Sequence, residues 1–430
     1  SGNALGSSGR GWHSSVSVWD ELVGQEHALA VLQQAAQGAR AIVDHAQEAH
    51  PAAETSGSVR VDASSLTQST DDPSRSMTHA WLITGPPGSG RSVAAIAFAA
   101  ALQCTGEFPG CGQCPGCRTT MARTNGDVSI LTTESTQIRI DEVRQIVLRA
   151  QTAPSQGRWR VIVIEDADRM MERTANVLLK AIEEPPERTV WLLCAPSAED
   201  MITTIRSRCR HLGLRIPDPH AVADLLVRRD GVDPADALSA ARAAQSHIGL
   251  ARALAKDPKM RQRRRQIITA PAQVRSVGEA VFAAEDLLSI AKTQAESQLE
   301  ERNAREKAEL MRQLGMEEGQ SPASHQRARI RELEEDQKRR SKRAIQDSLD
   351  RALVDLLGIY RDVLLRQLGT DQEPINDDCL DLIDQLCSQS TPQQTMKRVQ
   401  AIEEARKRLT TNMSVPLILE SMALSLRPQV

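Results

Sequence analysis

The sequence feature that most constrains the fold is a glycine-rich octapeptide, Gly85-Pro86-Pro87-Gly88-Ser89-Gly90-Arg91-Ser92. A short apolar run, Ala80 to Thr84, precedes it and an alanine-rich stretch follows, so the pattern predicts a strand, a loop and a helix. Glycines in such a loop let backbone N–H groups curl around phosphate oxygens, and the helix N-terminus adds positive potential. Ser92 would supply a hydroxyl ligand for Mg²⁺. The octapeptide therefore predicts a phosphate-binding loop in an α/β domain.

Arg91 departs from the usual pattern of such loops, in which a lysine occupies this position. The lysine reaches the β and γ phosphates as a compact point charge, whereas arginine is a longer planar fork and is not interchangeable with it. ATP or ADP with Mg²⁺ remains open as a ligand of this loop. We expect the chain's own turnover of nucleotide to be weak or absent.

Two further apolar runs, Arg160 to Ile164 and Val190 to Cys194, are each bounded by helical patterns. Strands separated by helices predict a parallel sheet covered on both faces, and we place this α/β domain at residues 16–216. Glu165 and Asp166 directly follow the first run, where one carboxylate would hold Mg²⁺ and the other would polarise water. The usual order of such a pair is aspartate and then glutamate. The swapped order therefore also counts against turnover.

Four of the eight cysteines crowd into residues 104–117. They are Cys104, Cys111, Cys114 and Cys117. Interleaved glycines allow tight two-residue loops, so four thiolates can converge on a tetrahedral Zn²⁺ ion. We favour a structural zinc site with every coordination position filled by protein, and the alternative is thiol redox chemistry of the C-x-x-C type. Sparse cysteines elsewhere indicate a reducing cytoplasm rather than a disulfide scaffold.

The remaining segments are predicted to be helical or solvated. Residues 1–15 are expected to be disordered and resemble an expression remnant rather than a signal peptide. Residues 37–76 have few bulky apolar side chains, which predicts a disordered insertion. Helical spacing predicts a small helical domain at 217–270 and a third, all-helical domain at 271–430. Within the latter, the highly charged residues 291–345 are predicted to form a solvated helical hairpin.

Composition excludes two classes of protein. The longest apolar run, Val93 to Leu102, has ten residues, well short of the roughly 20 that a membrane-spanning helix needs, so a soluble protein without membrane contact is expected. The net charge is −3 and aromatic residues make up only 2% of the chain. A zinc-knuckle protein that binds nucleic acid through base stacking or a broad basic surface is therefore not expected. Any contact with DNA would be local.

Five motifs occur in one order along the chain. They are Val23-Gly24-Gln25-Glu26, the glycine-rich octapeptide, the cysteine cluster, the run from Asn176 to Pro186, and Ser207-Arg208-Cys209. Together they resemble the bacterial DNA polymerase III clamp-loader subunits, over residues 18–216. The resemblance implies an AAA+ α/β module with a helical lid and a C-terminal helical collar domain. It also implies a hetero-pentamer with gamma/tau motor subunits and a delta subunit, which loads the sliding clamp onto primed DNA at the nucleoid.

The resemblance also implies roles for single residues. In that family the arginine of the Ser-Arg-Cys motif reaches the γ-phosphate of ATP held by a neighbouring subunit, so Arg208 would be an arginine finger acting in trans. The sensor position after the third strand run falls on Ala195 or Pro196, and neither has a side-chain donor. Arg252 resembles a second sensor. We therefore expect a non-motor subunit, and the alternative is an ATP-hydrolysing motor subunit that relies on Arg91.

Overall fold

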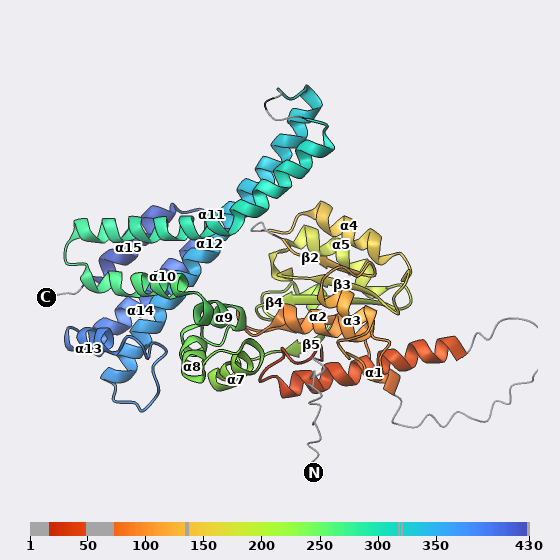
Figure 1. Cartoon of the computed structure of the whole chain (residues 1–430), viewed down its shortest axis with the longest axis horizontal. Coiled ribbons are helices and arrows are strands. Elements are labelled where there is room, and N and C mark those ends of the chain that lie inside the picture. The colour runs from red at the N-terminus through yellow and green to blue at the C-terminus, as the bar shows by residue number, and fades with distance from the viewer. Residues whose placement is uncertain (1–16, 49–72, 134–136, 317–318, 320, 428–430) are drawn as a thin grey trace, which may run out of the picture. The chain divides into compact units, whose positions relative to one another are not determined.

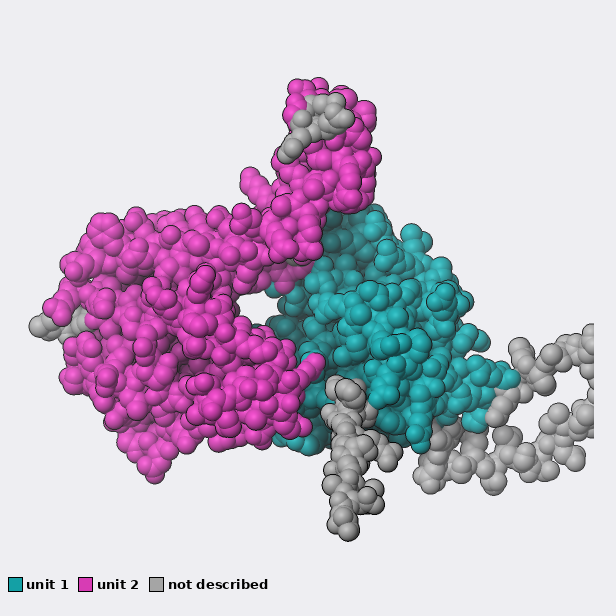
Figure 2. All heavy atoms as spheres, viewed as in Figure 1, with its two compact units in different colours: residues 1–132, 137–217 teal, residues 133–136, 218–430 magenta. Residues whose placement is uncertain are grey.

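The structure is a computed structural model that describes residues 17–48, 73–133, 137–316, 319 and 321–427. It divides the chain into two compact units (Figure 2), residues 1–132 with 137–217 and residues 133–136 with 218–430. The first unit contains the sheet, and the second is built from helices. No helix in the described ranges is long and apolar enough to cross a membrane.

Five parallel strands form the sheet of the first unit, in the order β2-β3-β4-β1-β5. They are β1 (Ala80–Thr84), β2 (Val128–Leu131), β3 (Arg160–Ile164), β4 (Thr189–Ala195) and β5 (Arg210–Gly213). Every residue of the central strands β1, β3 and β4 is buried, as the continuous apolar runs predict. The predicted parallel sheet is confirmed, and the two edge strands are additions that the sequence analysis lacks.

Helices cover both faces of the sheet (Figure 1). One face packs against α1 (Glu26–Glu48), α2 (Arg91–Leu102) and α3 (Pro115–Met121), and the other packs against α4 (Ile140–Ala150), α5 (Glu172–Glu183) and α6 (Thr203–Arg206). Successive strand residues point to opposite faces. Trp81 therefore meets Phe98 of α2 edge to face, with ring centroids 5.3 Å apart, whereas Trp191 packs on the α4 and α5 side. The α/β fold class is confirmed.

Helix α1 corrects one expectation from the sequence. The disordered insertion predicted at 37–76 is wrong for residues 37–48, which complete α1, and for the 3₁₀ turn η1 (Pro73–Ser76). Val43 is 1% exposed because the apolar stripe of α1 continues to this point with small side chains. The rest of that prediction, like the one for residues 1–15, lies outside the described residues.

The second unit contains two helical cores. Small apolar side chains form the first, between α7 (Pro219–Asp230), α8 (Pro234–Ala243) and α9 (Ile248–Lys256). The second core lies between α10 (Pro258–Thr269), η3 (Ala270–Gln273), α11 (Val277–Gln313), α12 (Ser324–Gln367), α13 (Leu380–Ser388), α14 (Pro392–Leu409) and α15 (Val415–Leu426). Tyr360, the only tyrosine of the sequence, is buried there. The predicted helical C-terminal region is confirmed.

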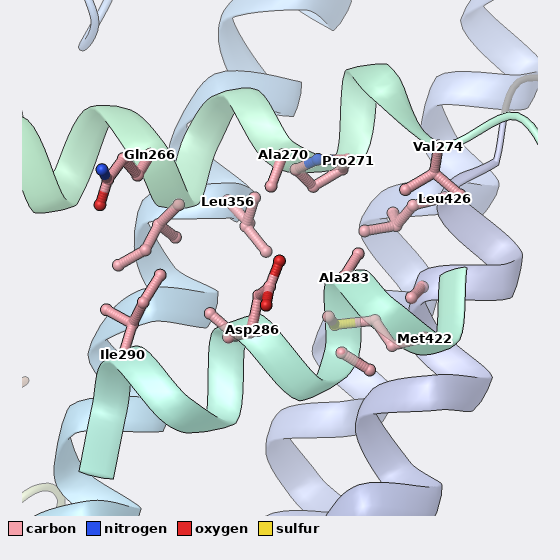
Figure 3. A pocket seen from close by; sticks show the side chains of 14 residues that line it. Gln266, Ala270, Pro271, Val274, Ala283, Asp286, Ile290, Leu356, Met422 and Leu426 are labelled. Atoms are coloured by element: carbon pink, nitrogen blue, oxygen red, sulfur yellow. The ribbon is translucent and has the colours of Figure 1, made fainter. Parts of the chain in front are cut away.

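Side chains from the loop before α13 fasten the first helical core to the second. Ser239 Oγ of α8 donates a hydrogen bond to Asp377 Oδ1 at 2.7 Å, and Arg242 pairs with Asp377 at 3.4 Å and with Glu373. A shallow apolar pocket also opens in this unit between α10, α11, α12 and α15 (Figure 3). Its polar lining residues are Gln266 and Asp286.

Candidate functional site

The glycine-rich loop joins the end of β1 to the start of α2 and folds tightly. Gly88 and Gly90 both have φ +88°, a conformation that side-chain-bearing residues rarely adopt. At Gly85 an added Cβ would lie 2.3 Å from Ser89 Oγ, so only glycine fits. Gln25, from the first motif, donates to Ser89 O at 3.2 Å and holds the loop against the start of α1. The backbone therefore has the curled form that a phosphate-binding loop requires.

Two polar atoms of this loop are buried without a hydrogen-bond partner among the described residues. They are Ser89 Oγ and Arg91 Nη1. Arg91 Nη2 lies 3.9 Å from Asp166 Oδ1, so the structure brings together the loop and the acidic pair after β3. The Arg91 side chain is only 16% exposed. Its positive charge is thus offset by a carboxylate of the same chain.

Arginines of the chain also neutralise the acidic pair. Glu165 accepts hydrogen bonds from Arg123 Nη2 at 3.2 Å and from Thr132 Oγ1 at 3.0 Å, and Arg123 lies two residues after the end of the short helix α3. Asp166 lies 3.8 Å from Arg169 Nε in addition to its contact with Arg91. Both carboxylates that would serve Mg²⁺ are therefore paired with cations. Arg123 and Thr132 are site residues that sequence reasoning missed, because nothing in the local sequence links them to β3.

Asp168 is a third acid at this edge and was also missed from the sequence. It lies in the turn η2 (Ala167–Arg169), and its Oδ1 atom is buried without a hydrogen-bond partner in the described part of the chain. Burial, and then the negative charge of Asp166, raise the pKa of the Asp168 carboxyl above its usual value. Three acids thus lie close together at this edge of the sheet. Burial and the neighbouring negative charge disfavour the ionised form of Asp168 there.

The last residue of β4 and the residue after it have a structural role. The backbone N–H of Gly85 donates to the carbonyl oxygens of Ala195 at 3.3 Å and Pro196 at 3.1 Å. These contacts fix the beginning of the glycine-rich loop. Neither side chain has a donor that would contact a terminal phosphate.

Arg208 lies on the surface in the turn between α6 and β5, and its side chain is 37% exposed. Its Nε donates to Glu183 Oε1 at 2.5 Å, and its Nη1 donates to Thr204 O at 2.7 Å. Glu183 is the last residue of α5 and is 44% exposed. An ion pair this exposed contributes about 1 kcal/mol or less, so a stronger anion can displace the glutamate.

Arg252 is held within the second unit. Its Nε donates to Asp230 Oδ2 at 2.9 Å, and Lys256 Nζ donates to the other oxygen at 3.0 Å. Although burial opposes the effect, these two cations lower the pKa of the Asp230 carboxyl. The structure therefore gives Arg252 a partner inside its own helical group, at the end of α7.

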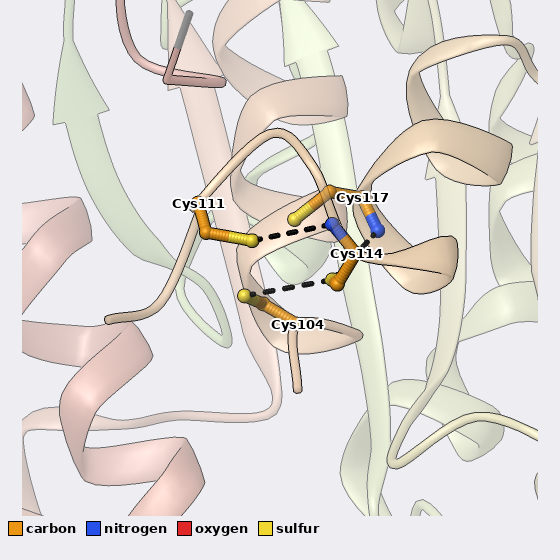
Figure 4. Close-up of side chains that lie close together, drawn as sticks. All are labelled: Cys104, Cys111, Cys114 and Cys117. Carbon is orange, nitrogen blue, oxygen red and sulfur yellow. Dashed lines mark hydrogen bonds between the residues drawn. The ribbon is translucent and has the colours of Figure 1, made fainter. Parts of the chain in front are cut away.

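The four clustered cysteines converge at the end of α2 and the start of α3 (Figure 4). Their sulfur atoms all lie within 4.8 Å of one another, and Cys114 Sγ is 3.8 Å from Cys104 Sγ. Four ligands at the roughly 2.3 Å of a zinc–sulfur bond would sit about 3.8 Å apart in a tetrahedron. The donor set therefore fits a metal ion that prefers tetrahedral thiolate coordination.

Backbone amides prepare these sulfurs to carry negative charge. The N–H groups of Gly106, Cys114 and Cys117 point at cysteine sulfurs, at 3.3 to 3.4 Å. Although burial opposes the effect, such donors lower the pKa of the Cys114 thiol to about 6. Burial raises the pKa of Cys117, which is fully buried. A bound cation would stabilise the thiolate form of all four.

The knuckle of residues 104–117 is anchored to the N-terminal segment. Trp19 Nε1 donates to Pro109 O at 3.1 Å, and Val18 N donates to Gly110 O at 3.1 Å. Arg40 of α1 donates to Cys104 O at 3.0 Å from the other side. These contacts place the cysteine cluster on the same sheet face as α1 and α2.

Replacing Gly110 by alanine should destabilise the α/β unit by about 2 kcal/mol or more. Gly110 has φ +94°, which alone costs a residue with a Cβ about 1 to 2 kcal/mol. The added Cβ would also lie 2.5 Å from Trp19 Nε1 and would push the indole away. Denaturant unfolding measures the loss. Gly126→Ala is the matched control because no atom lies within 4 Å of the added Cβ, and an equal loss there would contradict the argument.

Comparisons with known proteins place the chain in a family. A family model described as DNA polymerase III, delta subunit, matches residues 65–218, and one described as DNA polymerase III, delta subunit, C terminal, matches residues 344–427. The DNA polymerase III subunit delta' of Bacillus subtilis is 26% identical over 82% of this chain and 91% of that protein. Its Pseudomonas aeruginosa namesake is 37% identical over 37% of this chain and 50% of that protein.

A gamma/tau subunit of DNA polymerase III from Mycobacterium tuberculosis is also similar, with 30% identity over 41% of this chain and 36% of that protein. The chain thus spans half or less of the length of several curated relatives that it matches. Both family models are described as DNA polymerase III, delta subunit, and together they match more than half of the chain. The chain belongs to the family of DNA polymerase III delta prime subunits.

Proposed function

We propose that the chain is a stator, the delta prime subunit of a bacterial clamp loader, and that it hydrolyses no ATP itself. It supplies Arg208 to the ATP site of a neighbouring gamma/tau subunit. One observation carries the proposal: the catalytic acids are paired with arginines of the same chain, whereas Arg208 stands on the surface with an exchangeable partner. The pentamer, which includes a delta subunit, would load the sliding clamp onto primed DNA in the cytoplasm.

The nucleotide-type loop supports binding better than turnover. The backbone N–H groups of Gly88, Gly90, Arg91 and Ser92, together with the guanidinium of Arg91, would hold the phosphates of ATP or ADP, and the Ser92 hydroxyl would hold Mg²⁺. Bound Mg²⁺ would offset the phosphate charge. Both carboxylate oxygens of Glu165, however, accept hydrogen bonds, from Arg123 and from Thr132, so Glu165 is not free to act as a general base. A water molecule beside the terminal phosphate would therefore lack a group to accept its proton.

The surface position of Arg208 supports action in trans. Phosphoryl transfer builds up negative charge, and a guanidinium brought from outside stabilises it only when two subunits are correctly docked. The phosphate is a stronger acceptor than Glu183 because it has more charge and is excluded from water in a closed site. Arg252 would serve as a second sensor only after its ion pair with Asp230 opens.

The cysteine cluster is proposed to hold a structural Zn²⁺ ion through Cys104, Cys111, Cys114 and Cys117. Bound zinc would cross-link the knuckle, with no open position for substrate. The consequence reaches the acidic pair, because Cys117 belongs to α3 and Arg123 follows that helix to contact Glu165. Bound zinc would thus help to hold Arg123 in its ion pair with Glu165.

The isolated chain is expected to release no phosphate from ATP. Labelled ATP and ADP with Mg²⁺ would be titrated against the full chain, and phosphate release would be followed in the same sample. The absence of phosphate release agrees with a stator, whether or not the chain binds nucleotide. Sustained turnover that Arg91→Ala abolishes would make the chain a motor subunit of the gamma/tau type and overturn the proposal.

A further inference from the structure

The hairpin of residues 291–345 extends α11 and α12 beyond the apolar core of the second unit (Figure 1). Polar contacts hold its two helices together. Arg340 is 9% exposed and donates across the hairpin to Asn303 Oδ1 at 3.0 Å and Glu306 Oε2 at 2.9 Å. Nearer the tip, Gln326 Nε2 donates to Leu314 O at 3.0 Å. The outer faces of the hairpin therefore take no part in the contacts between its two helices.

One outer face of α12 has a row of four cations, which we call the basic stripe: Arg327, Arg331, Lys338 and Lys342. All four residues are exposed, and they follow one another at spacings of four, seven and four residues. With about 3.6 residues per turn, their side chains lie within about 60° of one another around the helix. At about 1.5 Å of rise per residue, the stripe is about 22 Å long.

The stripe differs from the other cations of the hairpin in its lack of partners. Most of the others form ion pairs with acids of α11 or α12: Arg302, Arg305, Lys307, Arg312, Arg339, Arg340 and Arg343. Over the ranges that the structure describes, no stripe side chain has an ion pair or a hydrogen bond. Four positive charges on one rigid helix face thus remain for an external polyanion.

We propose that the basic stripe binds the phosphate backbone of double-stranded nucleic acid. The hairpin contains no aromatic residue, so it cannot offer the base stacking on which single-strand binders rely. A duplex carries about one charge per 1.7 Å of its axis, so a length equal to that of the stripe contains about a dozen phosphates, and the four cations need no fixed register. Contacts of this kind position a protein on a duplex without reading its sequence.

The proposal does not rest on the function proposed above. Neither family model matches residues 219–343, so the stripe lies outside the two matched regions. The net charge of −3 does not argue against it, because salt screens charges that lie more than about 10 Å away. Two acids border the stripe: Glu334, which pairs with Lys307 of α11, and Glu335, which lies about 20° from Lys342 around the helix. Glu335→Gln should therefore tighten binding.

The test uses the full chain and a fluorescently labelled duplex DNA of about 30 base pairs, with anisotropy measured from 50 to 200 mM salt. The stripe variant is R327Q/R331Q/K338Q/K342Q. The matched control is R302Q/R305Q/K307Q/R312Q, which removes the same number of charges from α11. Glutamine has nearly the helix propensity of lysine and arginine, so both variants should keep their helices, and circular dichroism checks this.

Four phosphate contacts give a slope of about −3.6 in log affinity against log salt, or about a 100-fold loss of affinity between 50 and 200 mM. The stripe variant should lose most of this slope and bind at least tenfold more weakly at 50 mM, whereas the α11 variant should keep the slope. Equal losses in both variants, or a stripe variant that binds like the wild type, would overturn the proposal. So would failure of the wild type to bind at 50 mM salt, which would leave an acidic protein surface as the partner to test.

Discussion

An Arg208→Ala subunit, assembled with its motor and delta partners, is expected to slow ATP hydrolysis at the neighbouring site by about 10³-fold or more. Arginine fingers in other phosphoryl-transfer enzymes contribute between about 10³ and 10⁵ in kcat. The stability of the chain itself should change by less than about 1 kcal/mol, because the pair with Glu183 is exposed. Single-turnover hydrolysis and clamp loading on primed DNA measure the effect.

Arg206→Ala is the matched control for this experiment. Arg206 lies two residues earlier, and its Nη1 donates to the carbonyl of Ala198 at 3.4 Å. It should leave hydrolysis unchanged. Arg208→Lys should recover only part of the rate because lysine retains the charge and loses the planar fork. A complex with Arg208→Ala that loads clamps at the wild-type rate would remove the arginine finger from the proposed function.

Loss of the metal is expected to have the largest effect on stability. Structural zinc contributes about 10 to 16 kcal/mol of binding free energy in zinc-finger peptides at neutral pH. Part of this energy should stabilise the α/β unit here, so Cys117→Ser should lower its free energy of unfolding by at least about 3 kcal/mol. Denaturant unfolding and the zinc content of the purified chain measure the two consequences together.

Cys209→Ser serves as the control for the zinc experiment. Cys209 is half-buried, lies outside the cluster and belongs to the Ser-Arg-Cys motif. This variant should retain one zinc ion per chain. A wild-type chain that contains no zinc, and whose stability a strong chelator leaves unchanged, would contradict a structural metal site.

Local patterns allowed much of the site to be predicted. The glycine-rich loop and the cysteine cluster are each contained in fewer than fifteen consecutive residues, so their spacing alone indicates their geometry. The central strands were equally accessible because burial on both faces gives continuous apolar runs. Strand β5, with only Leu212 buried, has no such run and was missed.

Pairing over long sequence separations could not be predicted. Arg123 and Thr132 reach Glu165 only because α3 and β2 end at the same edge of the sheet as β3. Arg252 is a sensor candidate by its local sequence, but its partner Asp230 lies on another helix. The predicted insertion included residues 37–48 in error, because Ile42 and Val43 are the only large apolar side chains of that stretch and two neighbours cannot by themselves show a helical period.

The few aromatic residues are divided between the two units in a way that suits spectroscopy. Trp19, Trp81, Trp159 and Trp191 are buried in the α/β unit, and Tyr360 is buried in the helical unit. Trp12 lies outside the described residues and can be replaced by phenylalanine. Tryptophan emission would then follow the sheet, and far-ultraviolet dichroism would follow the helices, most of whose residues belong to the second unit. The intact chain thus carries its own pair of reporters, and the order in which its units unfold can be read without any added label.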